Sequence, residues 1–97
     1  MKPHRFHRHA DVEYAEAAQY YADISAELGR RFYDEIERLI AEIRANSGRF
    51  RQFAPPARRH FSRLFPYAVI YLDRPDHVWI VGIMHFKRHP ATWMERR

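Results

Sequence analysis

The stretch YAVIYLDRPDHVWIVGIM, residues Tyr67–Met84, decides the fold of this chain. Two runs within it, Tyr67–Leu72 and Val78–Met84, are rich in β-branched and aromatic residues and are apolar at nearly every position. Such runs are typical of strands that are buried on both faces. Between them lies Asp73–Asp76, with the sequence Asp-Arg-Pro-Asp, and Asp and Pro both favour a turn. We therefore expect a β-hairpin at the centre of a sheet.

Two helices are predicted before this hairpin. Residues Asp11–Leu28 are rich in Ala and Glu, their apolar side chains recur every three or four positions, and Asp11 can cap the start. Gly29 is expected to end this first helix. A second helix should end at Asn46-Ser47-Gly48, which suits a helix carboxyl terminus. Its apolar stripe consists of Phe32, Ile36, Leu39, Ile40 and Ile43. Together the two segments predict an antiparallel helical hairpin with almost no loop.

Shorter segments complete the predicted fold. His4–Arg8 suits an edge strand, Arg49–Pro56 is expected to be a connector, and Arg58–Leu64 is typical of a polar strand. The tail His85–Arg97 is expected to leave the last strand and lie across the sheet. The resulting fold class is α+β in the order β-α-α-β-β-β, with the helical hairpin packed on one face of a mostly antiparallel sheet.

Length and composition limit the class of protein. At 97 residues, 46% of them hydrophobic, the chain can form one core, so we expect a single domain over 1–97. No apolar run approaches the roughly 20 residues of a membrane span, and the amino terminus lacks the apolar stretch of a signal peptide. We therefore expect a cytoplasmic protein that does not bind a membrane. The absence of cysteine excludes disulfides and thiolate metal ligands, and we expect no metal and no cofactor.

The charge of the chain is unevenly distributed. Residues 1–48 contain seven Lys or Arg and nine Asp or Glu, a net charge of −2, whereas residues 49–97 contain ten and three, a net charge of +7. Such asymmetry indicates an anionic partner, either nucleic acid or an acidic protein segment. The other interpretation is a basic surface that only keeps the protein in solution.

A basic cluster is the main candidate for chemistry in the second half of the chain. Its members are Arg58, Arg59 and Arg63 in one strand and His85, Lys87 and Arg88 at the end of another. If these strands lie close together, the cluster would form a concave surface that binds phosphates. In RNA cleavage His85 would act as acid or base while Arg59, Arg63 and Arg88 stabilise the developing charge. The same cluster could equally be structural or bind a protein.

Several sequence fragments, in this order and spacing, resemble a known toxin superfamily. They are Ala17 with Tyr20 and Tyr21, Leu28-Gly29 with Phe32, Arg58-Arg59, Phe65-Pro66-Tyr67 with Ile70-Tyr71, and His85 with Arg88, Pro90, Trp93 and Arg96. Over nearly its whole length the chain thus resembles the RelE/ParE toxins, and their ParE-like plasmid-stabilisation branch most closely. The fold of that superfamily agrees with the one predicted above from periodicity.

The resemblance implies the toxin of a type II toxin–antitoxin system. Such a toxin inhibits growth, is neutralised by a cognate antitoxin whose extended carboxyl-terminal segment wraps over it, and meets operator DNA only through that antitoxin. The residues expected to bind the antitoxin are Tyr21, Phe32, Ile36, Leu39 and Tyr67.

Two activities are known within the superfamily. ParE-like toxins poison DNA gyrase without being hydrolases, whereas RelE-like toxins cut messenger RNA in the ribosome. The pattern Phe-Pro-Tyr followed by His-x-x-Arg-x-Pro-x-x-Trp favours gyrase here. The target would then meet a patch of Arg58, Arg59, Arg63, His85, Lys87, Arg88 and Trp93. The alternatives are a RelE-type endoribonuclease with His85, Arg59, Arg63 and Arg88 as catalytic residues, and an inactive or purely binding module.

Overall fold

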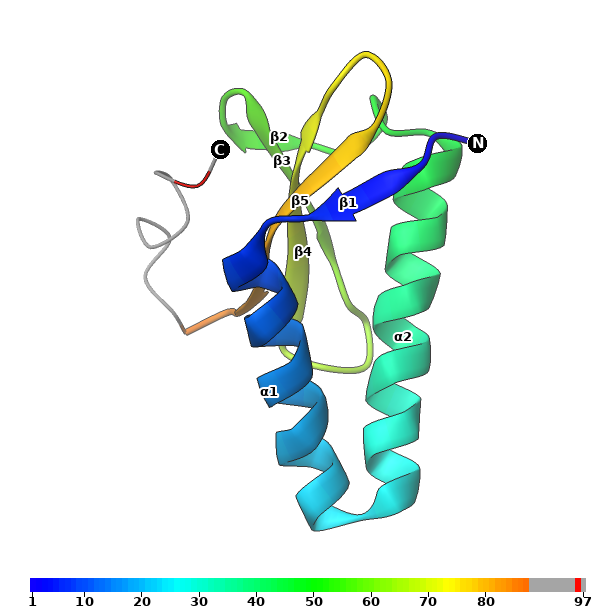
Figure 1. Cartoon of the computed structure of the whole chain (residues 1–97), viewed down its shortest axis with the longest axis vertical. Helices are drawn as coiled ribbons and strands as arrows, with labels where there is room; N and C mark the ends of the chain where they lie inside the picture. The colour runs from blue at the N-terminus through cyan, green and yellow to red at the C-terminus, as the bar shows by residue number, and fades with distance from the viewer. Residues whose placement is uncertain (88–95, 97) are drawn as a thin grey trace.

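The computed structural model describes residues 1–87 and 96 of the chain. Helices and strands follow the predicted order, with one additional short strand before the last three (Figure 1). In chain order they are β1 (His4–Phe6), α1 (Arg8–Ile24), α2 (Ala26–Ala45), β2 (Gln52–Ala54), β3 (Ala57–Phe61), β4 (Tyr67–Asp73) and β5 (Val78–His85). The predicted α+β fold class is therefore confirmed.

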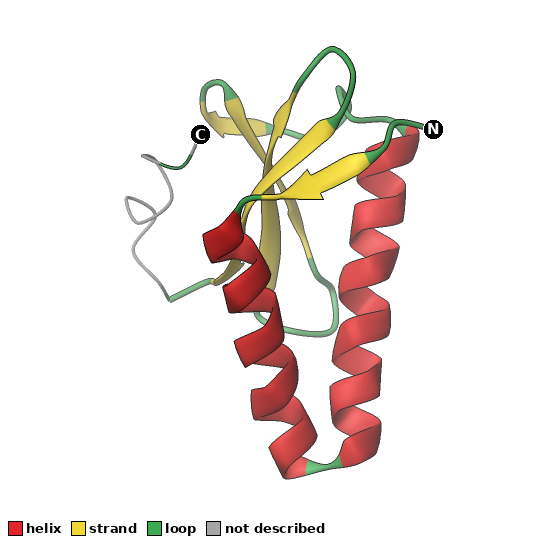
Figure 2. Cartoon of the chain, in the orientation of Figure 1, coloured by secondary structure: helices red, strands yellow, loops and turns green. Residues whose placement is uncertain are grey.

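The described strands form a five-stranded sheet in the order β1-β5-β4-β3-β2. The pairs β2 with β3, β3 with β4 and β4 with β5 are antiparallel, and β1 lies parallel to β5 at one edge. The β4–β5 hairpin is central, as its apolar sequence predicts. Both helices lie on one face of the sheet, and the tip of the helical hairpin extends beyond the strands (Figure 2).

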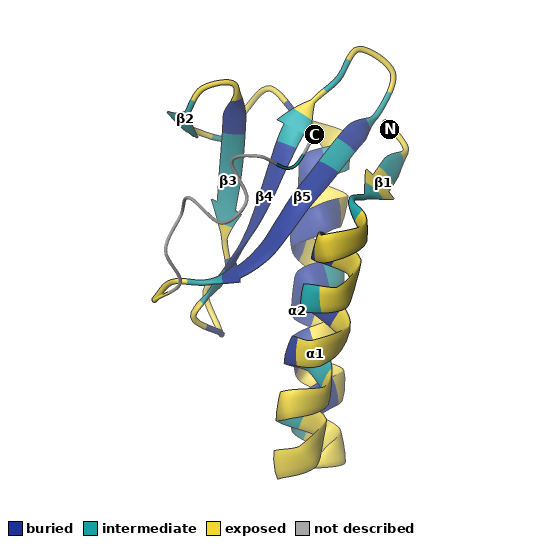
Figure 3. Ribbon diagram, turned by 60° about the vertical axis from the view of Figure 1, so that its left-hand side comes forward, coloured by how far each residue is buried: buried dark blue, intermediate teal, exposed yellow. Residues whose placement is uncertain are grey.

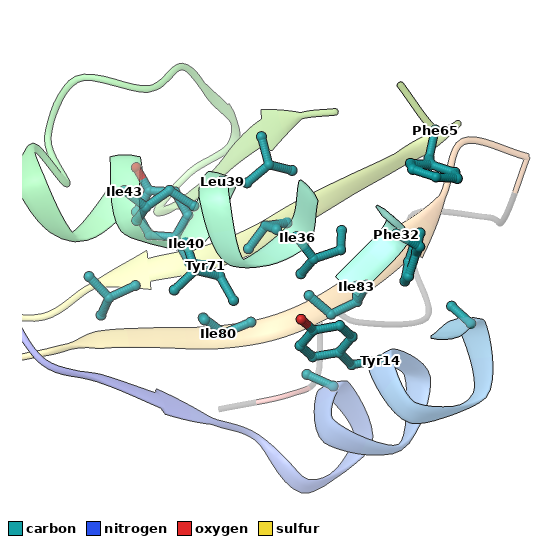
Figure 4. Packing of buried hydrophobic residues seen from close by; sticks show 14 residues of the cluster. Tyr14, Phe32, Ile36, Leu39, Ile40, Ile43, Phe65, Tyr71, Ile80 and Ile83 are labelled. Carbon is teal, nitrogen blue, oxygen red and sulfur yellow. The ribbon is translucent and has the colours of Figure 1, made fainter. Parts of the chain in front are cut away.

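The principal core lies between α2 and the central hairpin. The predicted apolar stripe of α2 is buried throughout and points toward the strands (Figure 4). It meets the helix-facing side chains of β4 and β5, which are Val69, Tyr71, Val78, Ile80 and Ile83. The buried Tyr71 hydroxyl donates a hydrogen bond of 2.6 Å to the carbonyl oxygen of Ser47, which closes this core at the end of α2.

The break between the helices differs from the prediction. Gly29 was expected to end the first helix, but the chain leaves helical geometry at Ser25 instead, where φ and ψ are −161° and 147°. Ser25 caps both helices, since its backbone N–H bonds the Tyr21 carbonyl and its hydroxyl oxygen accepts from the Leu28 N–H at 3.0 Å. Gly29 lies inside α2, where it allows the backbone of α1 to approach closely at Ala22.

Three other boundaries are also corrected. The first strand ends at Phe6, because the His7 ring accepts a hydrogen bond from the His9 N–H and caps α1, the role predicted for Asp11. The expected connector Arg49–Pro56 contains the short edge strand β2. Strand β3 ends at Phe61, because the Ser62 hydroxyl accepts hydrogen bonds from the backbone N–H groups of the two following loop residues, Leu64 and Phe65.

The face of the sheet opposite the helices is also apolar. Its buried members are Ala57, Ile70, Val81 and Met84, with Phe53, Ala54, Leu72 and Trp79 packed around them. Strands β4 and β5 are accordingly buried along most of their length, whereas the outer sides of the helices are exposed (Figure 3). No helix in the described part of the chain has the length and apolar composition required to cross a membrane.

Candidate functional site

A groove lies between α1 and the ends of the two central strands. Two adjoining hollows, of about 190 Å³ and about 520 Å³, share the side chains of Tyr20, Tyr67 and His85. Tyr67 begins β4 and His85 ends β5, and the two residues are paired in the sheet with their rings 5.2 Å apart in an edge-on arrangement. We call this surface the Tyr67 groove.

The two ends of the Tyr67 groove differ in chemistry. At one end the smaller hollow is lined by Glu13, whose carboxylate is paired with Arg96 at 2.7 Å, and by the exposed Glu16. At the other end the larger hollow is lined by Tyr21, Ile24 and Pro66, so it is mainly apolar. A ligand with an apolar segment beside a hydrogen-bonding or cationic group would match both ends, whereas a chain of phosphates would meet repulsion from the exposed carboxylate of Glu16.

Large apolar side chains are exposed around this groove. Tyr20 and Ile24 of the groove are 62% and 61% exposed, and Leu64, which lies two residues before the groove residue Pro66, is 62% exposed. Near the same end of the sheet, on its other face, Phe61 and Phe86 pack edge to face with ring centroids 5.2 Å apart and are both about half exposed. Exposed apolar side chains that cluster rather than scatter mark a surface used for binding proteins.

Among the described residues of the predicted catalytic set, only His85 lies in the Tyr67 groove. Its Nδ1 accepts a hydrogen bond of 3.1 Å from the Lys87 backbone N–H, which leaves Nε2 to carry the proton of the neutral ring. His85 could therefore donate a hydrogen bond, or exchange a proton, through Nε2.

The predicted basic patch is divided between the two faces of the sheet. Arg58 lies on the helix side and donates a hydrogen bond of 2.8 Å to the Phe50 carbonyl, so it is structural. Arg59 points to the opposite side, where its guanidinium stacks 4.3 Å from the centre of the Phe53 ring. Because successive strand residues alternate faces and β4 separates β3 from β5, Arg59 and His85 do not share a surface.

The remaining members of the basic patch lie outside the strands. Arg63 is exposed in the loop after β3, and Lys87 is exposed just beyond β5. Arg88 and Trp93 lie outside the described residues. The expected concave surface that would unite the arginines with His85 is therefore not formed by the described side chains.

The predicted antitoxin-binding residues also divide into two groups. Phe32, Ile36 and Leu39 are completely buried beneath the sheet, so they hold the core and offer no surface. Tyr21 and Tyr67 are partly exposed and line the Tyr67 groove. An apolar helical stripe indicates that a face is covered, and here the chain's own sheet covers it.

Sequence reasoning missed the contribution of α1 to the site. Tyr20, Ile24, Glu13 and Glu16 were not among the predicted site residues, although all four line the groove. A usable signal was present, since Tyr20 is next in sequence to Tyr21, a predicted site residue, and an adjacent helix position falls on a different side of the helix.

The buried carboxylate of Glu35 on α2 positions the loop between β3 and β4, which lies beside this site. Glu35 is only 4% exposed and accepts two hydrogen bonds from the Arg38 guanidinium, at 2.8 Å and 3.0 Å. It also accepts from the Ser62 hydroxyl at 2.7 Å and from the Arg63 N–H at 3.2 Å. The loop that carries Leu64 is thereby fixed to the helical layer.

No protein-family model matches this chain, and no curated protein matches its sequence. Within residues 1–87 and 96, no group of three or more histidine, aspartate or glutamate side chains is arranged to hold a metal ion.

Proposed function

We propose that this protein is the toxin of a type II toxin–antitoxin system and that it acts in the cytoplasm by binding a protein target, DNA gyrase, without hydrolysing a substrate. A cognate antitoxin would neutralise it and would carry the contact with operator DNA. The proposal combines the RelE/ParE resemblance of the sequence with the α+β fold that this resemblance implies.

One observation carries the choice of a protein target. Exposed Tyr20 and Ile24 line the Tyr67 groove, and tyrosine is among the residues that most often supply the energy of protein interfaces. The exposed carboxylate of Glu16 at the other end of the groove disfavours an RNA backbone. We place the target-binding surface on this groove.

The alternative is a ribosome-dependent endoribonuclease of RelE type. The position of His85 favours it, because an imidazole that lines a hollow beside the Tyr67 ring can act as an acid or base. Against it stands Arg59, which lies across the sheet from His85 and cannot stabilise charge at the same phosphate.

A growth assay followed by two target assays tests the proposal. Induction without an antitoxin should stop growth, and the purified protein should inhibit gyrase supercoiling and stabilise a cleaved DNA complex. Ile24→Ala should weaken gyrase inhibition by about tenfold, as expected when an interface anchor is truncated. Val12→Ala is the matched control, because Val12 is a similarly exposed β-branched residue of α1 outside the groove.

The outcomes separate the two candidates. Unchanged gyrase activity at saturating toxin would overturn the main proposal. Site-specific cuts in ribosome-bound messenger RNA that disappear in His85→Gln would establish the endoribonuclease instead. Harmless expression without any antitoxin would contradict both and would favour a plain binding module.

A further inference from the structure

A second hollow, of about 400 Å³, lies on the other side of α1. It is bounded by α1, α2 and β1. Its lining includes the aromatic and ionisable side chains of His4, Phe6, Asp11, Tyr14, Tyr33 and Glu37. With 3.6 residues per turn, the α1 residues of this hollow and those of the Tyr67 groove lie on nearly opposite sides of the helix. We call it the outer hollow.

Aromatic rings form one wall of the outer hollow. Tyr14 and Tyr33 are stacked with ring centroids 5.7 Å apart and planes within 15° of parallel, and Phe6 packs against Tyr14 at 6.0 Å. Tyr33 is 51% exposed, so one face of this stack remains open to a ligand. The negative face of an aromatic ring attracts cations.

Two carboxylates complete the outer hollow. Glu37 is oriented by the Tyr14 hydroxyl, which donates a hydrogen bond of 2.9 Å to its Oε2. Across residues 1–87 and 96, neither Asp11 nor Glu37 has a Lys or Arg within ion-pairing distance. Burial and then the charge of Arg44 lower the pKa of His4, so its ring stays neutral and does not offset the carboxylates.

The wider environment of the outer hollow is acidic as well. Residues 8–45, which form the helical layer and its short link, contain nine Asp or Glu and five Lys or Arg, a net charge of −4 in a chain of net charge +5. The hollow therefore lies in the layer that attracts cations, although the protein as a whole is basic.

We propose that the outer hollow binds a guanidinium group, presented as an arginine side chain of a partner polypeptide. A guanidinium is planar and can stack on the open face of Tyr33 while it donates paired hydrogen bonds to Glu37. A lysine ammonium fits less well, because it is more strongly hydrated and cannot donate in a planar fork. The volume of the outer hollow, about 400 Å³, lies within the range of known ligand sites. The site is independent of the proposed function.

The test is an amide NMR titration of the full chain with the peptide acetyl-Gly-Arg-Gly-amide, with its lysine analogue, and with free agmatine. The arginine peptide should give saturable shifts in β1, α1 and α2 around the outer hollow, and it should bind more tightly than either of the other two probes. Glu37→Gln should weaken this binding by about tenfold, since a charge-assisted pair is lost while the Tyr14 hydroxyl keeps an acceptor.

A matched control removes the same charge elsewhere on α2. Glu27 lies ten residues from Glu37, about 15 Å along the helix, which is beyond the range of screened charges at physiological salt. The Glu27→Gln variant should therefore bind the peptide with unchanged affinity. If Glu37→Gln loses its fold by circular dichroism, Tyr33→Ala replaces it, because that exposed ring can be removed without opening the core.

Each result has a defined meaning. No saturable shift overturns the site, and equal weakening by Glu27→Gln reduces it to a general electrostatic effect and overturns it as well. Equal affinity for the lysine peptide overturns the choice of guanidinium. Equal or tighter binding of agmatine overturns the polypeptide partner in favour of a free guanidinium compound.

Discussion

The Glu35 carboxylate of α2 accepts a hydrogen bond of 2.7 Å from the Ser62 hydroxyl, which belongs to the loop between β3 and β4. This bond connects the helical layer to the loop beside the Tyr67 groove. Hydrogen bonds from Arg38 are the main reason that the pKa of Glu35 falls from 4.5 to about 2, and the Ser62 hydroxyl and the Arg63 N–H lower it further, against the effect of burial. The folded state therefore favours the charged carboxylate.

The stability of the protein should fall in acid because of this residue. The pKa of Glu35 is lower in the folded state than in the unfolded chain, so its contribution is complete above pH 4.5 and is lost as the pH falls toward about 2. Glu35→Gln should lower the free energy of unfolding by about 2 kcal/mol at neutral pH and by less at about pH 3. Urea denaturation at both pH values measures this. An equal loss at both would contradict the assignment to charge.

The stability of the protein should also fall in alkali, because of Tyr71. Burial raises the pKa of its hydroxyl from 10.0 to about 12, so the stability it provides is complete below pH 10 and is lost as the pH rises toward 12. Tyr71→Phe also removes the hydrogen bond to the Ser47 carbonyl and should cost about 1–2 kcal/mol at about pH 8. Its deficit relative to the unsubstituted chain should shrink at about pH 11. Tyr33→Phe, at an exposed ring, serves as the control and should change neither value.

The helical layer and the central hairpin were predictable because their signals are local. Burial of Phe32, Ile36 and Ile43 repeats with the helical period, and the turn residues between β4 and β5 mark the hairpin directly. The position of the helix break was less clear, since the Ala-rich and Glu-rich pattern continues through Ser25. The break falls at Ser25 because its extended backbone ends α1 and its hydroxyl caps the start of α2, four residues before Gly29.

The candidate site could be predicted only in part, because it depends on strand register. Arg59 lies in β3 and His85 ends β5, and the order β5-β4-β3 and the alternation of side chains place them on opposite faces. A change of register by one residue would have reversed this result. No pattern in the chain specifies which residue of β3 pairs with which residue of β4.

The close approach of the helices at Gly29 supports a packing prediction. A Cβ at this position would lie 2.7 Å from the Ala22 Cβ and 2.8 Å from the Ala22 Cα, so Gly29→Ala forces the helices apart. The variant gains about 1 kcal/mol of helix propensity, but the backbone clash should outweigh it and leave a net loss of about 1–2 kcal/mol. Thermal unfolding measures the change. Gly48→Ala is the control, since its nearest neighbour would be a carboxylate oxygen at 3.9 Å and its stability should stay within about 0.5 kcal/mol.

The ion pair between Glu13 and Arg96 completes an edge that β1 leaves open. Strand β1 pairs with β5 only as far as Ile80. Beyond that point the Val81 carbonyl accepts a hydrogen bond from Arg96 at 2.8 Å, and the Ile83 N–H donates to Glu13 at 3.2 Å. The two side chains are themselves 2.7 Å apart and about 90% buried, with exposures of 10% for Glu13 and 11% for Arg96. A charged pair thus takes the place of a longer edge strand.

Breaking this pair should therefore cost more than losing a surface ion pair. Arg96→Met leaves the Glu13 carboxylate buried without its cation and should lower the free energy of unfolding by about 3 kcal/mol, whereas Glu16→Gln, an exposed acid one turn along α1, should change it by less than about 0.5 kcal/mol. The double variant Glu13→Gln with Arg96→Met separates charge pairing from edge protection. If pairing dominates, it should be more stable than Arg96→Met alone, because the unpaired charge has been removed. If protecting the edge of β5 dominates, the losses of the single variants Glu13→Gln and Arg96→Met should add in the double variant. Urea denaturation of the unsubstituted chain, these two single variants and the double variant distinguishes the results.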